Sequence, residues 1–237
     1  WPDLSLADPT TFQDAIDMMK EYAIWDEAPA SIREHLLEGL AHPEMETPKK
    51  LTNTRAYIHS VADPRSTCVA AANKAKELGY TPYVLSTALE GDACNLGIFF
   101  SGIANEVTKT GRPFAAPCAI ISAGETTVTI HGPCGAGGPN QETALGYPLK
   151  LHAQSPTVCL SMDSDGTDGP SDIAGGISDN QTFERACELG LNLWEMLGRH
   201  DSSTALLQLN DALITGHTGT NIMNFRVVVI EKKENES

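Results

Sequence analysis

Segments with the patterns of strands and of helices alternate from residue 55 to the end of the chain, and this alternation constrains the fold more than any other feature. Strand-like runs lie at 55–62, 81–87, 117–124, 126–130, 157–163, 211–216 and 225–232. Amphipathic, helix-like segments lie between them at 63–80, 89–111, 140–153 and 182–199. Such alternation predicts an α/β fold with a mostly parallel or mixed sheet flanked by helices.

The first 50 residues do not follow this pattern, because they contain two helix-like segments and no strand. Helices are predicted at 9–23 and 28–40, with Thr10 or Thr11 as the first cap, and a polar linker with two prolines follows. We therefore expect a helical segment at 1–50, the end of a missing N-terminal domain, and an α/β domain at 51–237. The start at Trp1 instead of Met also leads us to expect a processed product or a fragment.

Composition excludes several classes of protein. The chain carries 16 Lys and Arg against 31 Asp and Glu, a formal net charge of −15, so we expect no nucleic-acid partner. No apolar run approaches the ~18 residues of a membrane span, and no signal peptide opens the chain, so we expect no membrane association and a cytoplasmic location. The six cysteines form no C-x-x-C pair, which predicts reduced thiols and no zinc site.

The first of three polar, glycine-rich loops covers residues 123–142, between a predicted strand and a predicted helix. Its backbone N–H groups could hold an anion, although a ligand-free hairpin with a helix cap has the same composition. It is not a Walker A loop, and Asn140 stands where G-x-G-x-x-G needs its third glycine. Glu125, between two strand-like runs, is either an exposed edge residue or a functional carboxylate.

The second loop, SMDSDGTDGPSDIAGG at 161–176, gathers negative charge in a flexible segment. Its aspartates are Asp163, Asp165, Asp168 and Asp172. An EF-hand is excluded, because the glycine and glutamate that it needs at positions 6 and 12 are missing. Two explanations remain: a solvated turn with a helix cap, or a site where one or two carboxylates hold Mg²⁺ and substrate phosphates complete its shell.

The third loop, TGHTGTN at 215–221, offers hydroxyl groups and backbone N–H groups around two glycines. It could hold phosphate oxygens or substrate hydroxyls, and a hairpin without a ligand is the alternative. Each loop is a weak signal by itself. Together, three such loops beside strands of one α/β unit suit a pocket for a phosphorylated, oxygen-rich ligand.

In this order and at this spacing, the loops resemble the MOFRL-type glycerate kinases. The family pattern runs G-G-E-T-T-V-T-V, G-x-G-G-R-N-Q-E, G-T-D-G-x-D-G-P-T-D-A-A-G and T-G-P-T-G-T-N. This sequence has AGETTVTI, GAGGPNQE, DGTDGPSDIAGG and TGHTGTN. It departs from the family at Ala123, Pro139 and His217, and Pro139 replaces an Arg that would give a bidentate anion contact.

The resemblance implies an ATP- and Mg²⁺-dependent kinase that phosphorylates D-glycerate, or a similar hydroxy acid, at its 2-hydroxyl. Family members carry a further N-terminal α/β domain, and their active site lies in the cleft between the halves. The resemblance therefore implies that this chain supplies the C-terminal half of the active site and is weakly active by itself.

On this basis we expect Asp165 and Asp168 to hold Mg²⁺ and, with Glu125, to be the catalytic residues. The expected substrate- or phosphate-binding residues are Gly135, Gly137, Gly138, Asn140, Glu142, Thr167, Thr218, Gly219, Thr220 and Asn221. Phosphoryl transfer depends mostly on positioning and electrostatics, which suits loops rich in backbone donors. The loops contain no Lys or Arg, so we expect the missing half to bring a cationic residue.

Two other hypotheses stay open. A hydroxypyruvate reductase-type oxidoreductase would need a strand, G-x-G-x-x-G and an acid ~20 residues later, and the sequence shows no such set. A non-catalytic ligand-binding fragment would bind a small molecule without transferring phosphate. A homodimer is also compatible with the sequence.

Overall fold

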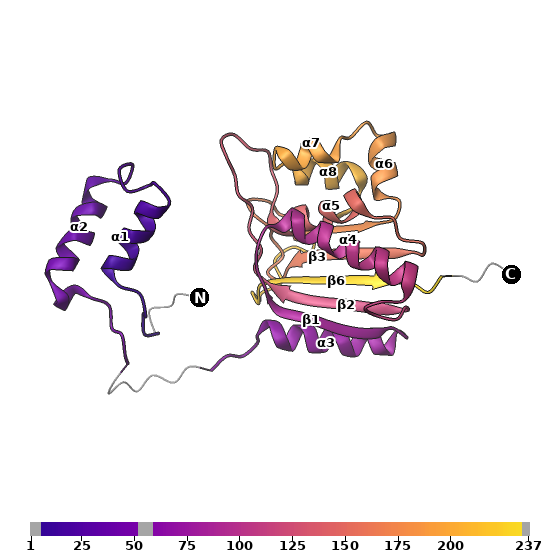
Figure 1. The fold of residues 1–237 in the computed structure, drawn as a ribbon, viewed down its shortest axis with the longest axis horizontal. Coiled ribbons are helices and arrows are strands. Elements are labelled where there is room, and N and C mark those ends of the chain that lie inside the picture. Colours follow the sequence, from indigo (N-terminus) through magenta and orange to yellow (C-terminus); the bar gives the residue numbers. More distant parts are fainter. Residues whose placement is uncertain (1–5, 52–58, 234–237) are drawn as a thin grey trace. The chain divides into compact units, whose positions relative to one another are not determined.

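The computed structural model describes residues 6–51 and 59–233 and divides the chain into two compact units, Trp1–His59 and Ser60–Ser237 (Figure 1). The boundary lies slightly after the expected one at residue 50. Most of the strand predicted at 55–62 lies outside the described residues, and residues 59–62 form no strand. No helix in the described ranges is long and apolar enough to span a membrane.

The first unit is a pair of helices, as predicted. They are α1 (Phe12–Glu21) and α2 (Ala30–Ala41). Thr11 begins α1 with a reciprocal capping box, in which its side chain and that of Asp14 each accept from the other's backbone N–H. The helices pack closely where the Phe12 ring lies against Gly39, because a Cβ there would be only 2.5 Å from the ring.

The second unit is built on a six-stranded sheet with the order β1-β2-β6-β3-β4-β5. The strands are β1 (Thr81–Leu89), β2 (Cys118–Gly124), β3 (Thr157–Asp163), β4 (Gly175–Asp179), β5 (Ala212–Leu213) and β6 (Asn224–Ile230). Strands β1 and β2 pair in parallel, and every other pair of neighbouring strands is antiparallel. Strand β6 lies in the centre of the sheet and runs opposite to both of its neighbours. The α/β class and the mixed sheet are confirmed, and the mostly parallel alternative is wrong.

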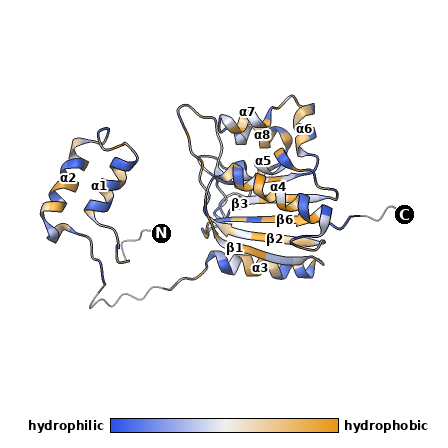
Figure 2. Cartoon of the chain, in the orientation of Figure 1, coloured by the Kyte–Doolittle hydropathy of each residue, from blue (hydrophilic) through white to orange (hydrophobic). Residues whose placement is uncertain are grey.

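Helices cover both faces of this sheet (Figure 1). They are α3 (Pro64–Glu77), α4 (Ala93–Thr110), α5 (Pro139–Gly146), α6 (Thr182–Glu188), α7 (Leu193–Gly198) and α8 (Ser202–Leu209). The strand period of two divides the core: Ile121 packs with Cys68 of α3, whereas Ile120 packs with Phe100 of α4. Figure 2 shows the hydrophobic residues along β2 and β6 that this packing buries.

Two local predictions differ from the structure, and two elements were not predicted. Residues 126–130 form only an isolated bridge from Thr127 to Asp92 instead of a strand. The helix expected at 182–199 breaks into α6 and α7, because Gly190 takes a left-handed conformation with φ 71°. Strand β4 and helix α8 were not predicted. The break near Pro148 is confirmed, since α5 is followed by a short 3₁₀ turn there.

Candidate active site at the rim of the sheet

The register of the three central strands brings the glycine-rich loops together. Gly124 at the end of β2 and Asp163 at the end of β3 both pair with Asn224, the first residue of β6. The loop after β2, the loop after β3 and the loop before β6 therefore meet at one rim of the sheet. We call this region the acidic rim, because it holds Glu125, Asp163, Asp165 and Asp168.

The aspartate loop and the TGHTGTN loop interlock. The Thr218 backbone N–H donates to the Asp165 carbonyl at 3.1 Å, and the Asn221 amide donates to the Asp165 carboxylate at 3.2 Å. Gly166 has φ 95° and packs so closely that a Cβ would lie 1.9 Å from the Gly216 carbonyl oxygen. Only glycine fits this crossing, so the contact between the two loops is part of the fold.

Asp165 is the more accessible of the two expected metal ligands. Its Oδ1 accepts from the backbone and the hydroxyl of Thr167 at 2.8 and 2.9 Å, and its Oδ2 accepts from Asn221. The side chain remains partly exposed. These bonds leave lone pairs on both oxygens and hold the carboxylate in one orientation, as a cation ligand requires.

Asp168 is buried and caps helix α5 from a distant part of the chain. Its Oδ1 accepts from the Asn140 N–H at 3.1 Å and its Oδ2 from the Gln141 N–H at 2.9 Å. Burial raises the pKa of Asp168, and the hydrogen bonds from Gln141 and Asn140 oppose the rise. The helix start that we expected to hold a phosphate thus already holds a carboxylate.

The glycines before α5 allow close packing of this loop against Asp168 and α8. A Cβ on Gly138 would lie 2.3 Å from the Asp168 carboxylate, and one on Gly137 would lie 2.3 Å from the Ser202 hydroxyl oxygen. The Gly135 N–H donates to the Arg199 carbonyl at 2.8 Å. These contacts fix the loop against the start of α8, and any contact of its exposed part with phosphate stays a prediction.

Glu142, an expected substrate-binding residue, is paired with a histidine. Its side chain is buried, and its Oε1 lies 2.9 Å from His200 Nδ1. Burial raises the pKa of Glu142, while His200 lowers it. The carboxylate pairs with His200 at the turn before α8, and a contact of Glu142 with substrate stays a prediction.

A buried arginine, which lies outside the three loops, adds positive charge beneath the acidic rim. Arg226 on β6 is fully buried, and its Nη2 donates to the Thr126 hydroxyl at 2.6 Å. Burial raises the pKa of Glu125, as does Asp163, and Arg226 opposes this rise. The signal in the sequence was an arginine at an inward position of the strand Asn224–Ile230, whose alternate residues are buried.

The described part of the chain contains no group of three or more His, Cys, Asp and Glu side chains arranged to hold a metal ion. A cation held by one or two carboxylates together with substrate phosphates stays a prediction.

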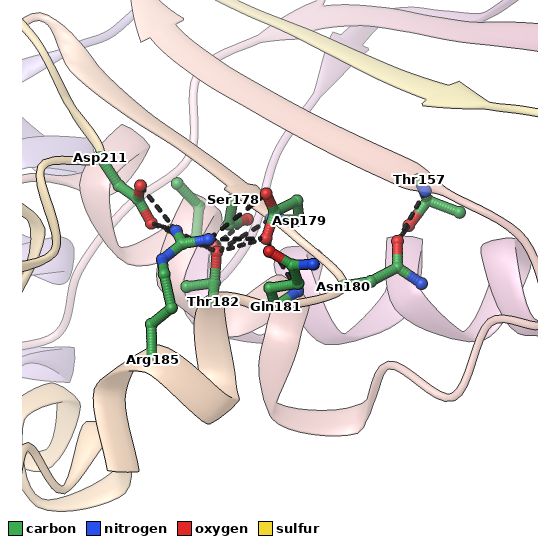
Figure 3. A network of polar contacts seen from close by, with 9 residues as sticks. Thr157, Ser178, Asp179, Asn180, Gln181, Thr182, Arg185 and Asp211 are labelled. Atoms are coloured by element: carbon green, nitrogen blue, oxygen red, sulfur yellow. Dashed lines mark hydrogen bonds and ion pairs between the residues drawn. The ribbon is translucent and has the colours of Figure 1, made fainter. Parts of the chain in front are cut away.

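A second polar network lies at the opposite end of β3. Arg185 of α6 donates to Asp179 at 3.1 Å and to Asp211 at 2.5 Å, and Asn180 accepts from the Thr157 N–H (Figure 3). A shallow cavity of about 470 Å³ adjoins this network, lined by residues 153–158 and 179–181. The polar groups of the network bond to one another and fasten α6 to the sheet, so we assign the network a structural role.

The fold and this rim define a MOFRL-type α/β domain, and residues 118–224 match the MOFRL family. The chain belongs to this family. It is 39% identical over 230 residues to a glycerate 2-kinase of Pyrococcus horikoshii, covering 97% of this chain and 52% of the relative. It is 36% identical to a D-glycerate 2-kinase of Thermotoga maritima, covering 97% and 51%.

A protein named putative hydroxypyruvate reductase, from Agrobacterium vitis, is 36% identical and covers 95% of this chain and 50% of the relative. Two crystal structures share the fold. The glycerate kinase of Thermotoga maritima has a TM-score of 0.74 and 35% identity, covering 94% of this chain and 51% of that one. A protein of Pyrococcus horikoshii has a TM-score of 0.71 and 39% identity, covering 96% and 52%. This chain spans about half the length of the curated relatives that it matches.

Proposed function

We propose that this chain supplies the C-terminal half of the active site of an ATP-dependent D-glycerate 2-kinase. The observation that carries the proposal is the pairing of both Gly124 and Asp163 with Asn224, which gathers carboxylates, hydroxyls and backbone donors at one rim. The relatives named as glycerate 2-kinases support the choice of reaction. The reaction breaks the bond between the γ-phosphorus of ATP and the β,γ-bridging oxygen, so that ADP leaves. A new bond joins this phosphorus to the 2-hydroxyl oxygen of glycerate, whose proton is released to solvent.

The rim residues have the chemistry for this reaction. Asp165 would hold Mg²⁺ together with phosphate oxygens, and the ion would neutralise charge on the transferring phosphoryl group. Asp168 would keep the loop in place from beneath, through its bonds to α5. Thr220 and Asn221 are exposed, and Asn221 donates to Asp165, so the two side chains would orient substrate hydroxyls.

We also propose that the first unit is the end of a further N-terminal domain, and that the missing domain completes the site. The three loops contain no Lys or Arg, and a triphosphate needs exposed cations. A cytoplasmic location suits an ATP-dependent enzyme whose six cysteines are all free.

An assay of the chain alone and of the chain fused to the N-terminal half of the Pyrococcus horikoshii relative tests the proposal. We expect ³¹P NMR to detect 2-phosphoglycerate and ADP with the fusion, and at least about 100-fold less product with the chain alone. A fusion that is folded but forms no phosphoglycerate contradicts the proposal. NADH oxidation with hydroxypyruvate by the same fusion would favour the oxidoreductase named among the relatives.

A further inference from the structure

Arg226 is the largest fully buried side chain among the described residues, and it lies in an unusual place. It stands in the middle of the sheet, paired with Ser122 of β2 on one side and Ser161 of β3 on the other. Two and four residues further along the same face of β6, Val228 and Ile230 belong to the apolar core. A charged residue has thus taken a core position next to the acidic rim.

This arginine is poorly satisfied for a buried charge. Its Nε and Nη1 have no hydrogen-bond partner among the described residues, and neither does the hydroxyl of Ser122. Among the described residues, no carboxylate oxygen lies within 4.0 Å of an Arg226 side-chain nitrogen, the distance limit for an ion pair. A buried arginine without a close counter-ion costs free energy of folding, so stability alone does not explain this residue.

The pKa of Arg226 also indicates that its burial costs free energy of folding. Burial lowers its pKa to about 10, and Cys159, Glu125, Asp168 and Asp163 raise it only in part. Because the pKa in the folded state lies below the ordinary value of 12.5, the charged form disfavours the folded state at neutral pH.

A direct hydrogen bond of Arg226 leads to the catalytic candidate. Its Nη2 donates to the Thr126 hydroxyl, and Thr126 directly follows Glu125. The next residue is held by a bond from the Thr127 N–H to the Gly91 carbonyl at 2.9 Å. Arg226 therefore fastens the turn that presents Glu125, and its charge faces the carboxylates of the acidic rim from below.

We propose that Arg226 is a positioning residue, which holds the turn at Glu125 in place and supplies the acidic rim with the positive charge that its own loops lack. The proposal deepens the kinase function and rests on it for the role of Glu125. The structural part, the attachment of the turn, stands independently of the reaction.

Hydrogen exchange and thermal unfolding of this chain test the attachment. In R226M, which keeps an apolar side chain of similar length, we expect exchange at the Thr127 amide to quicken roughly 10-fold and Tm to be unchanged or raised by about 2–4 °C. T126V should quicken exchange to a similar degree, but it should lower Tm, because it removes the hydroxyl that accepts from the buried guanidinium. V228A is the matched control on the same face of β6, and it should lower Tm without local change at Thr127.

Kinetics of the fusion enzyme test the catalytic consequence. We expect R226M to lower kcat for glycerate phosphorylation by roughly 10–100-fold, with little change in KM, because the substrate contacts remain while Glu125 is less well placed. Unchanged exchange at Thr127 in R226M, or a loss of Tm as large as in T126V, overturns the positioning role. If the fusion with Arg226 intact shows no kinase activity, the proposed function fails, and the exchange data still decide the role of Arg226.

Discussion

At the scale of single residues, two carboxylates of the acidic rim lie in different environments. Asp165 stays partly exposed and is held by Thr167 and Asn221, whereas Asp168 is buried and caps α5. We expected both to hold Mg²⁺ on the basis of the family resemblance, and the metal role of Asp168 stays a prediction. What distinguishes them is burial, which depends on α5, a helix far away in sequence.

Replacement of Asp168 should affect stability directly. In D168N, an amide nitrogen faces the backbone donors of Asn140 or Gln141, so one acceptor is lost inside the protein. We expect the free energy of unfolding in urea to fall by about 1–3 kcal/mol. D172N, a change at an exposed aspartate of the same loop, is the control and should stay within about 0.5 kcal/mol. Equal stability of the two variants would mean that Asp168 is not a cap.

Glu142 should make the stability of the fold fall as the pH rises, whereas ordinary acid unfolding lowers stability as the pH falls. Burial raises its pKa in the folded state, so the folded protein binds the proton more tightly than the unfolded chain. Stability should therefore fall as the pH rises from the ordinary pKa of about 4.5 through the raised value. Thermal unfolding of the chain and of E142Q across this range measures the effect. The fall in Tm should be smaller in E142Q, and identical pH profiles would contradict this assignment.

At the scale of elements, short-range signals predicted helices and strands well where caps and periodicity agree. Asp63 and Pro64 begin α3 as expected, and Gly111 ends α4 in a left-handed conformation. The failures have physical reasons. Strand β4 begins with Gly175 and Gly176, which have no apolar side chains to show alternation, and it exists because β3 provides its hydrogen bonds.

Helix α5 gives a prediction about glycine at this scale. Gly138, its N-cap residue, leaves no room for a Cβ beside Asp168, so G138A should lower the free energy of unfolding by about 1–3 kcal/mol. Gly102 lies on the exposed side of α4 with nothing near its Cβ position. G102A should therefore raise the free energy of unfolding by about 0.5–1 kcal/mol. Chemical denaturation measures both, and equal changes in the two variants would refute the packing argument.

At the scale of the whole second unit, the functional prediction depended on loops and the structure explains why they meet. The sequence indicated three polar loops next to strands, but not that β6 runs between β2 and β3 in the opposite direction. That insertion places the start of β6 beside the ends of the other two strands. Arg226 escaped prediction for the same reason, since its neighbours come from strands far apart in the sequence.

The central claim is that these loops form half of one magnesium-phosphate site, and paramagnetic relaxation by Mn²⁺ in this chain tests it most directly. We predict that Mn²⁺ broadens the amide signals of residues 125–127, 163–168 and 216–221 at the same low concentration, and that D165N abolishes the broadening in all three loops. Broadening in only one loop, or broadening spread over acidic surfaces such as α6 and unchanged in D165N, would contradict the claim.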